Sequence, residues 1–125
     1  MTFGVGIDII EVSRIHKEIS KKNGGFKDRV FTQGEIDYCE SKITKAQNYA
    51  GRFSAKEAFF KALGSGWSNG FAWTEVEVAK DKAGKPYIIT HGKVKKFIKQ
   101  NKISKIHLSL SHIKETATAI VSLEQ

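Results

Sequence analysis

A carboxylate and an ammonium group stand one helical turn apart in the segment GRFSAKEAFFKALGSG, residues 51–66. Because Glu57 and Lys61 are four residues apart, an α-helix places both side chains on one flank, beside an apolar arc. That arc consists of Tyr49, Phe53, Phe60 and Leu63. Charged groups beside an apolar face are partly desolvated, so each requires a partner. The same spacing also fits an ordinary surface ion pair worth only about 0.2–0.5 kcal/mol.

A second carboxylate, Asp8, lies in an N-terminal segment rich in Val and Ile, which predicts a strand over residues 2–12. Alternation divides this strand into a face with Phe3, Val5, Ile7 and Ile9 and a face with Gly4, Gly6, Asp8 and Ile10. Two glycines beside an aspartate leave room for a ligand to approach the backbone. The alternative is structural, with Asp8 capping a turn where the strand ends.

Basic residues form a stripe on the next predicted element. Ser13 is expected to cap a helix through about residue 22, along which Arg14, Lys17 and Lys21 share one side. Such a stripe is usually only a solvated face, but docking of an acidic partner would require the same arrangement. The whole chain carries 21 basic and 13 acidic residues, a formal charge of +8. This charge favours nucleic acid, a phosphorylated small molecule or an acidic protein as a partner.

The remaining pattern predicts a single α+β domain over residues 1–125. Thr32 and Glu35 form a capping-box signature for a short helix through about residue 42, and a long helix follows over 45–63 and stops at Gly64. The loop GSGWSNG, residues 64–70, could bring backbone amides to a phosphate, although it lacks the P-loop pattern. Strands are expected in TEVEVAKD and PYIITH, a helix over 92–102, and a closing hairpin of KIHLSLSH and TATAIVSL. This order favours a long central helix packed on a mostly antiparallel sheet.

Several classes of protein are not expected. No apolar run approaches the length of a membrane span, and the first residues lack the basic region of a secretory signal. The single cysteine, Cys39, excludes an intramolecular disulfide, and together these features favour a cytoplasmic location. The four histidines form no recognisable zinc motif.

Three segments, in order and with matching spacing, resemble the holo-[acyl-carrier-protein] synthase family, the small 4′-phosphopantetheinyl transferases. They are GIDIIEVSRI, GRFSAKEAFFKALGSG and SLSHIKETATAIV. A GKPY segment at residues 84–87 matches the Gly-Lys-Pro turn of the same family. The resemblance covers nearly the whole chain and implies the phosphopantetheinyl transferase-like fold.

The resemblance also implies an activity. Such an enzyme transfers 4′-phosphopantetheine from coenzyme A to a serine of an apo-acyl carrier protein and releases adenosine 3′,5′-bisphosphate, in fatty acid and lipid biosynthesis. Family members of this size use Mg²⁺ and are homotrimers with sites at subunit interfaces. Acyl carrier proteins are strongly acidic, so the positive charge would have a partner. Neither a nucleic acid nor a membrane is then expected as a partner.

The resemblance implies roles for individual residues. Asp8 and Glu57 would bind Mg²⁺ with the coenzyme A diphosphate, and Lys61 would lie beside the same diphosphate. We further expect Glu57 to take the serine proton, directly or through a metal-bound water, and Lys61 to stabilise developing charge. The other residues expected around coenzyme A are Arg52, Lys56, Gly64, Lys85, Pro86 and His112, with Lys85 and His112 supplied by a neighbouring subunit. The acidic helix of the carrier is expected to dock on Arg14, Lys17 and Lys21.

Two alternatives to this enzyme are open. One is a basic nucleic-acid-binding module that uses the lysines of residues 93–105, although aromatic and basic residues do not interleave there as a stacking platform requires. The other is a structural subunit or an inactive relative of the family. Binding of coenzyme A that depends on Mg²⁺ would distinguish the enzyme from both.

Overall fold

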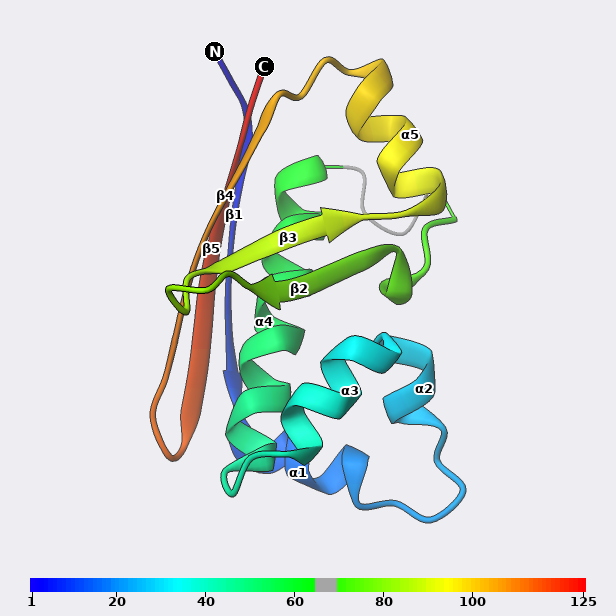
Figure 1. Ribbon diagram of the computed structural model, residues 1–125, viewed down its shortest axis with the longest axis vertical. Coiled ribbons are helices and arrows are strands. Elements are labelled where there is room, and N and C mark those ends of the chain that lie inside the picture. Colours follow the sequence, from blue (N-terminus) through cyan, green and yellow to red (C-terminus); the bar gives the residue numbers. More distant parts are fainter. Residues whose placement is uncertain (65–69) are drawn as a thin grey trace.

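A three-stranded antiparallel sheet and a long helix form the frame of the computed structural model, which describes residues 1–64 and 70–125. The strand order is β1-β5-β4, and a separate antiparallel pair, β2-β3, lies on the other side of helix α4 (Figure 1). The bounds are β1 Thr2–Glu11, β2 Val76–Lys80, β3 Pro86–Thr90, β4 Lys105–His112, β5 Thr116–Glu124 and α4 Lys45–Leu63. The prediction of an α+β fold with a long central helix on an antiparallel sheet is confirmed.

The smaller helices gather at the two ends of α4. Helices α1, α2 and α3 surround one end, α5 lies toward the other, and the two chain termini are side by side (Figure 1). Their bounds are α1 Val12–Ile19, α2 Phe26–Val30, α3 Gln33–Glu40 and α5 Gly92–Gln100, with a 3₁₀ turn, η2, at Trp73–Glu75. The predicted loop GSGWSNG falls largely on residues 65–69, outside the described residues.

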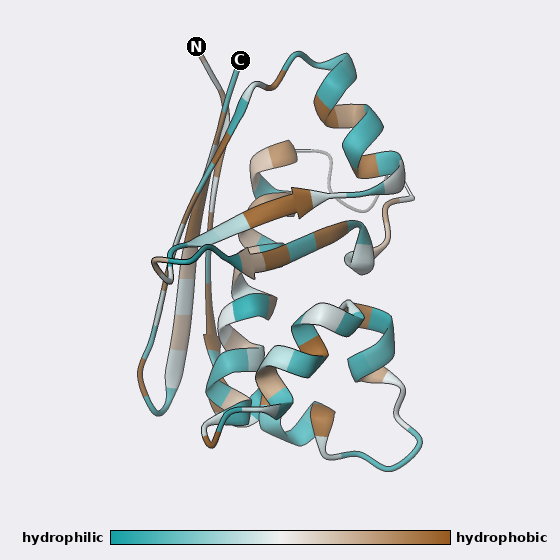
Figure 2. Ribbon diagram, in the orientation of Figure 1, coloured by the Kyte–Doolittle hydropathy of each residue, from teal (hydrophilic) through white to brown (hydrophobic). Residues whose placement is uncertain are grey.

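Two predicted helix signals are confirmed. The Thr32 hydroxyl accepts a hydrogen bond from the Glu35 amide at 3.3 Å, and the Glu35 carboxylate accepts one from the Thr32 amide at 2.9 Å, which is the capping box. Helix α4 ends where expected, because Gly64 takes the left-handed region with φ of 85°. Helix α5 has Val94 buried and its lysines exposed, and Figure 2 shows it as largely hydrophilic with a few hydrophobic residues.

The predicted start of the first helix is wrong. Helix α1 begins at Val12, with Glu11 at the N-cap and no side-chain cap, so Ser13 does not cap it. The Val12 amide instead donates to the Glu115 carbonyl at the β4–β5 turn, which fixes the end of β1 without a capping side chain. The helix also ends early, at Ile19, so Lys21 lies beyond it.

Two short segments also differ from the sequence-based expectation. Trp73–Glu75 is a 3₁₀ turn and not the start of a strand, because the Glu75 carboxylate accepts hydrogen bonds from the amides of Ala72 and Lys93. Those bonds hold the turn and cap the start of α5. Helix α2 was not predicted, since it has only five residues and follows the break at Asn23–Gly25.

Helix α4 packs directly on the backbone of β1. A Cβ atom on Gly4 would lie 2.0 Å from the Ala62 carbonyl oxygen, and one on Gly6 would lie 1.9 Å from the Ala58 carbonyl oxygen. The expectation that these glycines leave room for a ligand is therefore wrong, because the helix fills that room. Asp8 lies on the same face of the strand, two residues beyond Gly6, so its position depends on this close packing.

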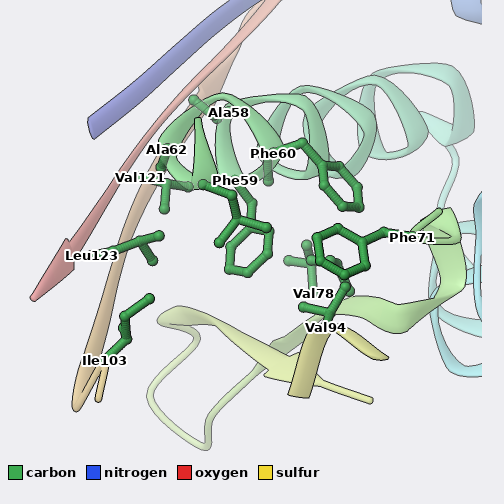
Figure 3. Packing of buried hydrophobic residues seen from close by; sticks show 14 residues of the cluster. Ala58, Phe59, Phe60, Ala62, Phe71, Val78, Val94, Ile103, Val121 and Leu123 are labelled. Carbon is green, nitrogen blue, oxygen red and sulfur yellow. The ribbon is translucent and has the colours of Figure 1, made fainter. Parts of the chain in front are cut away.

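The other side of α4 carries the larger side chains of the main core. Figure 3 shows Phe59 and Phe60 pointing from the helix toward Phe71 and the β2–β3 side, while Ala58 and Ala62 lie toward the three-stranded sheet. Small residues therefore face the sheet and aromatic residues face the hairpin. This division explains how one helix packs tightly against β1 on one side and fills a wider space on the other.

Candidate active site

An open cleft of about 620 Å³ lies between the end of β1 and helices α1, α2 and α4. Its residues include both expected metal ligands and the expected catalytic lysine, namely Asp8, Glu57 and Lys61. Its basic residues also include the three expected to dock the carrier, namely Arg14, Lys17 and Lys21. Residues from separate parts of the chain, expected to perform the chemistry and to bind the partner, thus share one cavity.

Asp8 is held rigidly at the floor of this cleft. Its backbone carbonyl accepts hydrogen bonds from the Ser54 hydroxyl at 3.1 Å and the Thr118 hydroxyl at 2.8 Å. Its Oδ1 atom accepts a hydrogen bond from Lys61 Nζ at 3.2 Å, and the same ammonium group donates to the Ile7 carbonyl at 2.9 Å. Its Oδ2 atom is buried without a hydrogen-bond partner among the described residues. A buried carboxylate oxygen without a donor is costly, so a cation or a donor beside this atom would stabilise the site.

The surroundings of Glu57 disfavour the charged form of its carboxyl group. Burial raises the pKa of its carboxyl above the ordinary value, and the negative charge of Asp8 raises it further, while Lys61 opposes the shift. A cation beside both carboxylates would remove this penalty. The raised pKa also makes Glu57 a stronger proton acceptor than an ordinary surface glutamate.

These two carboxylates fit the expected magnesium ion. Mg²⁺ prefers oxygen ligands and is commonly held by one or two carboxylates together with phosphate oxygens and water. Within the described residues there is no group of three or more His, Cys, Asp or Glu side chains placed to hold a metal. Asp8 and Glu57 are therefore the two side chains of this cleft that could hold such an ion.

A second cluster of cations surrounds the ring of Tyr38. The guanidinium of Arg52 lies 4.1 Å from the ring centroid, and the ammonium groups of Lys42 and Lys80 lie at 4.8 and 5.1 Å. The hydrogen bond with Lys80 and the charges of Lys80, Lys42 and Arg52 lower the pKa of Tyr38. Arg52 is only 4% exposed, and its Nε atom has no hydrogen-bond partner among the described residues. This concentration of positive charge is suited to an anion.

His112 belongs to this second cluster. Its Nδ1 atom lies 3.1 Å from Gln47 Oε1, and burial followed by the charges of Lys80 and Arg52 lowers its pKa. Pro86 stands opposite Lys80 in the β2–β3 ladder, which brings this end of the hairpin, with Lys85, to the same side.

The expected coenzyme A residues therefore do not gather around Asp8 within one chain. None of them except Lys61 is among the residues that line the cleft, and Gly64 only ends α4.

Lys56 has a different environment from the one expected. Its side chain is fully buried, and its Nζ atom lies 2.6 Å from the Glu35 carboxylate. It also donates to the carbonyl oxygens of Val30 at 2.7 Å and Trp73 at 3.3 Å. The expectation that Lys56 contacts coenzyme A phosphates directly does not fit this environment, because all three donors of the ammonium group are used inside the protein.

The residues that α2 contributes to the cleft, Phe26 and Arg29, were not predicted from the sequence. The signal was the apolar spacing of Phe26 and Val30, which are four residues apart. That signal was too short to predict a helix without knowledge of the core that it packs against. Arg29 adds a further cation to the three cleft residues that were expected to dock the carrier.

Taken together, the site defines an α+β protein whose cleft combines two carboxylates, a lysine and a basic rim, a combination suited to phosphoryl-group chemistry. A family model described as the 4′-phosphopantetheinyl transferase superfamily matches residues 4–121. The chain belongs to this superfamily.

Individual relatives agree over the full length. The holo-[acyl-carrier-protein] synthase of Geobacter sp. (strain M21) is 42% identical over 125 residues, covering 100% of both chains. The crystal structure of the synthase from Neisseria meningitidis superposes with a TM-score of 0.91 at 30% identity, covering 100% of both chains. The synthase from Bacillus anthracis str. Ames in complex with CoA (3′,5′-ADP) gives a TM-score of 0.81 at 37% identity, covering 99% of this chain and 97% of that one.

The alternative of a nucleic-acid-binding module receives no support from these comparisons. Of the helices in the described part of the chain, none is both long and apolar enough to cross a membrane.

Proposed function

We propose that this protein transfers 4′-phosphopantetheine from coenzyme A to a serine of an apo-acyl carrier protein, giving the holo-carrier and adenosine 3′,5′-bisphosphate. The observation that carries the proposal is Asp8, which has an unpartnered carboxylate oxygen among the described residues and lines the same cleft as Glu57 and Lys61. The superfamily and the relatives named holo-[acyl-carrier-protein] synthase support the choice of substrates.

Asp8 and Glu57 would hold Mg²⁺ in this reaction. When bound, the ion would neutralise charge on the coenzyme A diphosphate and on the leaving phosphate. The chain itself supplies position and proton transfer. Glu57, with its raised pKa, accepts the proton of the carrier serine as the serine oxygen attacks the phosphorus that bears the pantetheine arm. The new bond from oxygen to phosphorus forms while the diphosphate bridge breaks, and adenosine 3′,5′-bisphosphate leaves.

Lys61 would stabilise the negative charge that develops on the phosphorus oxygens during this transfer. Its ammonium group already lies 3.2 Å from Asp8 Oδ1, and its side chain is about half exposed to the cleft. A phosphate that enters beside Asp8 therefore meets a cation with little rearrangement. Stabilisation of the charge that develops on phosphorus oxygens by a prepositioned donor accounts for about 10²–10³ in rate in comparable sites.

The basic rim of the cleft is the proposed docking surface for the acidic carrier. Arg14, Lys17 and Lys21 line it, as does Arg29 from α2. Lys21 is engaged by Glu18 at 2.8 Å, whereas no ion pair joins Arg14, Lys17 or Arg29 to an acidic group of the described residues. Cations without acidic partners at the mouth of the site would guide an acidic helix toward Glu57.

We further propose that the working form is a homotrimer with each site shared between two subunits. The cleft with Asp8 and the cluster around Tyr38 with Arg52 and His112 are separate in one chain, so a coenzyme A molecule that uses both requires a neighbour. The outer face of the sheet offers a surface for that neighbour. It exposes apolar side chains that face away from α4, namely Val5, Ile7, Ile9 and Ile120. Exposed apolar groups of this size on one sheet face are typical of subunit interfaces.

Two experiments test these proposals. Mass spectrometry of an apo-carrier incubated with the protein, coenzyme A and Mg²⁺ should show the mass of the holo-carrier. The product should be absent with EDTA and strongly reduced in Asp8→Asn, and an unmodified carrier under full conditions would refute the activity. Sedimentation should give a trimer that Ile7→Lys dissociates, whereas a monomer at all concentrations would refute the shared site.

A further inference from the structure

Lys56 forms a buried ion pair with Glu35 and does not line the cleft that contains Asp8, Glu57 and Lys61. Lys56 precedes Glu57 on α4, yet both Lys56 and Glu35 have fully buried side chains. Replacement of such a pair by apolar groups is often neutral or stabilising, so its presence is not explained by stability. We propose that Lys56 and Glu35 form a positioning pair that holds the α2 wall of the cleft in the geometry that binds the carrier. This inference rests on the proposed function.

The pair joins segments from four separate parts of the chain. Glu35 accepts hydrogen bonds from the Thr32 amide at the start of α3 and from the Val78 amide of β2 at 2.7 Å. Lys56 binds the carbonyl oxygen of Val30, the last residue of α2, and that of Trp73 in η2. Four segments are thus attached to α4 through one side chain and its counter-ion.

The carbonyl oxygens of Val30 and Trp73 belong to segments that pack around Phe53 and so shape the aromatic wall of the cleft. The Phe53 ring, on α4, stacks on the Trp73 ring with centroids 5.1 Å apart and contacts the Phe26 ring of α2 at 6.0 Å. Phe26 and Phe53 both line the cleft, as does Arg29 on the same short helix. Lys56 therefore fixes, through main-chain contacts, the neighbours on both sides of Phe53.

Helix α2 depends on this attachment. It has five residues, it begins after Gly25 in the left-handed region, and no side chain caps it. Its other polar tie in the described residues is the ion pair of Lys27 with Glu40 at 3.1 Å, which is partly exposed on both sides. An exposed pair contributes little to holding a helix in place. Without Lys56, the end of α2 keeps its apolar contacts but loses its one fully buried hydrogen bond to α4.

The test compares Lys56→Met with the double variant Lys56→Met/Glu35→Gln. The single variant leaves a carboxylate buried without its counter-ion, so its melting temperature should fall. The double variant removes that charge but turns one acceptor of the Thr32 and Val78 amides into a donor, so it should recover only part of the loss. Neither variant supplies a donor to Val30 and Trp73, so both should raise the KM for the carrier by about tenfold or more with kcat changed less than about threefold. Hydrogen–deuterium exchange of residues 24–31 should speed up in both.

Val94→Ala provides a matched control, because Val94 is fully buried on α5 and does not line the cleft. It should lower the melting temperature and leave the KM for the carrier unchanged. If the KM of the double variant returns to the wild-type value together with its melting temperature, the pair serves stability alone and the proposal is overturned. A raised KM for coenzyme A instead of the carrier would also overturn it and favour a direct contact.

The exchange experiment needs no transfer activity, so it separates this proposal from the proposed function. One outcome is that the wild-type protein shows no transfer while α2 exchanges faster in the variants that lack Lys56. In that case the proposed function is wrong and the proposed attachment of α2 is right. If transfer is normal and exchange of residues 24–31 is unchanged in the double variant, the function is right and the positioning role is wrong. Should Lys56→Met alone fail to fold, the double variant carries the test.

Discussion

The packing of α4 on β1 predicts that Gly6→Ala damages the site without touching it. The added Cβ atom would lie 1.9 Å from the Ala58 carbonyl oxygen, whereas ordinary contacts begin near 3.4 Å. Strand and helix must therefore separate by the difference, about 1.5 Å, because both contacting groups are backbone and cannot rotate away. Overpacking of this kind costs about 1–3 kcal/mol. Alanine adds no backbone strain of its own here, since Gly6 is in an extended strand.

The same separation moves Asp8 relative to Lys61 and Glu57. A displacement of about 1 Å in a catalytic geometry can cost about 10²-fold in rate, so transfer at saturating substrates should fall by about that factor. Thermal unfolding and mass-spectrometric turnover measure the two effects on the same preparation. Gly4→Ala is the matched control, because its Cβ would lie 2.0 Å from the Ala62 carbonyl oxygen but four residues from Asp8 instead of two.

The two variants should lose similar stability, whereas Gly4→Ala should lose less than about tenfold in rate, because each residue adds about 3.3 Å of distance along the strand. Equal rate losses for both would mean that the whole helix moves as a rigid unit. A Gly6→Ala protein with wild-type turnover would refute the idea that this contact positions Asp8.

Three further outcomes are expected. Glu57→Gln should raise the melting temperature at pH 7.5, because a raised pKa means that the folded state disfavours the charged carboxylate; the gain should shrink as pH falls through the raised pKa and vanish below about 4.5, and a loss at pH 7.5 would contradict it. Arg29→Glu should raise the KM for the carrier by about tenfold at low salt and less at high salt, while the same reversal at the exposed Lys99 on α5 should not. Glu40→Gln should cost about 1 kcal/mol, chiefly because a neutral amide oxygen accepts the hydrogen bond of the Tyr49 hydroxyl, 2.6 Å long in the wild type, more weakly than a carboxylate does. That bond and two lysines lower the pKa of Glu40 to about 2. Urea titrations should therefore show the full difference in unfolding free energy between wild type and variant above about pH 4.5, and this difference should disappear as the pH falls toward about 2.

Most of the fold could be predicted because its signals are local. The long helix over 45–63, the capping box at Thr32 and the closing hairpin depend on periodicity and capping chemistry within a few residues. The errors concern elements that depend on distant partners. Helix α1 begins where the Glu115 carbonyl accepts the Val12 amide, and η2 forms because Glu75 also caps α5. Neither partner can be identified from the adjacent sequence.

The site was predicted unevenly for a related reason. Asp8, Glu57 and Lys61 were identified from motif residues, and the structure brings them into one cleft. The resemblance alone could not distinguish a motif residue that faces the cleft from one that faces the core. Lys56 and Glu57 are adjacent on α4, so they point in directions about 100° apart, and only the position of Glu35 decides which of them is buried.

The separation of the two basic regions is the structural argument for the proposed trimer. Helix α4 carries Glu57 and Lys61 toward the cleft and Arg52 toward the Tyr38 cluster, and Arg52 does not line the cleft within one chain. A ligand with phosphates along its length can use both only when a second copy brings its cluster to the cleft of the first. The apolar outer face of β1 follows directly from the alternation that turns Asp8 inward, because Ile7 and Ile9 must then point outward. In the proposed trimer, the same strand would therefore supply both a residue of the shared site, Asp8, and the apolar surface that contacts the neighbour.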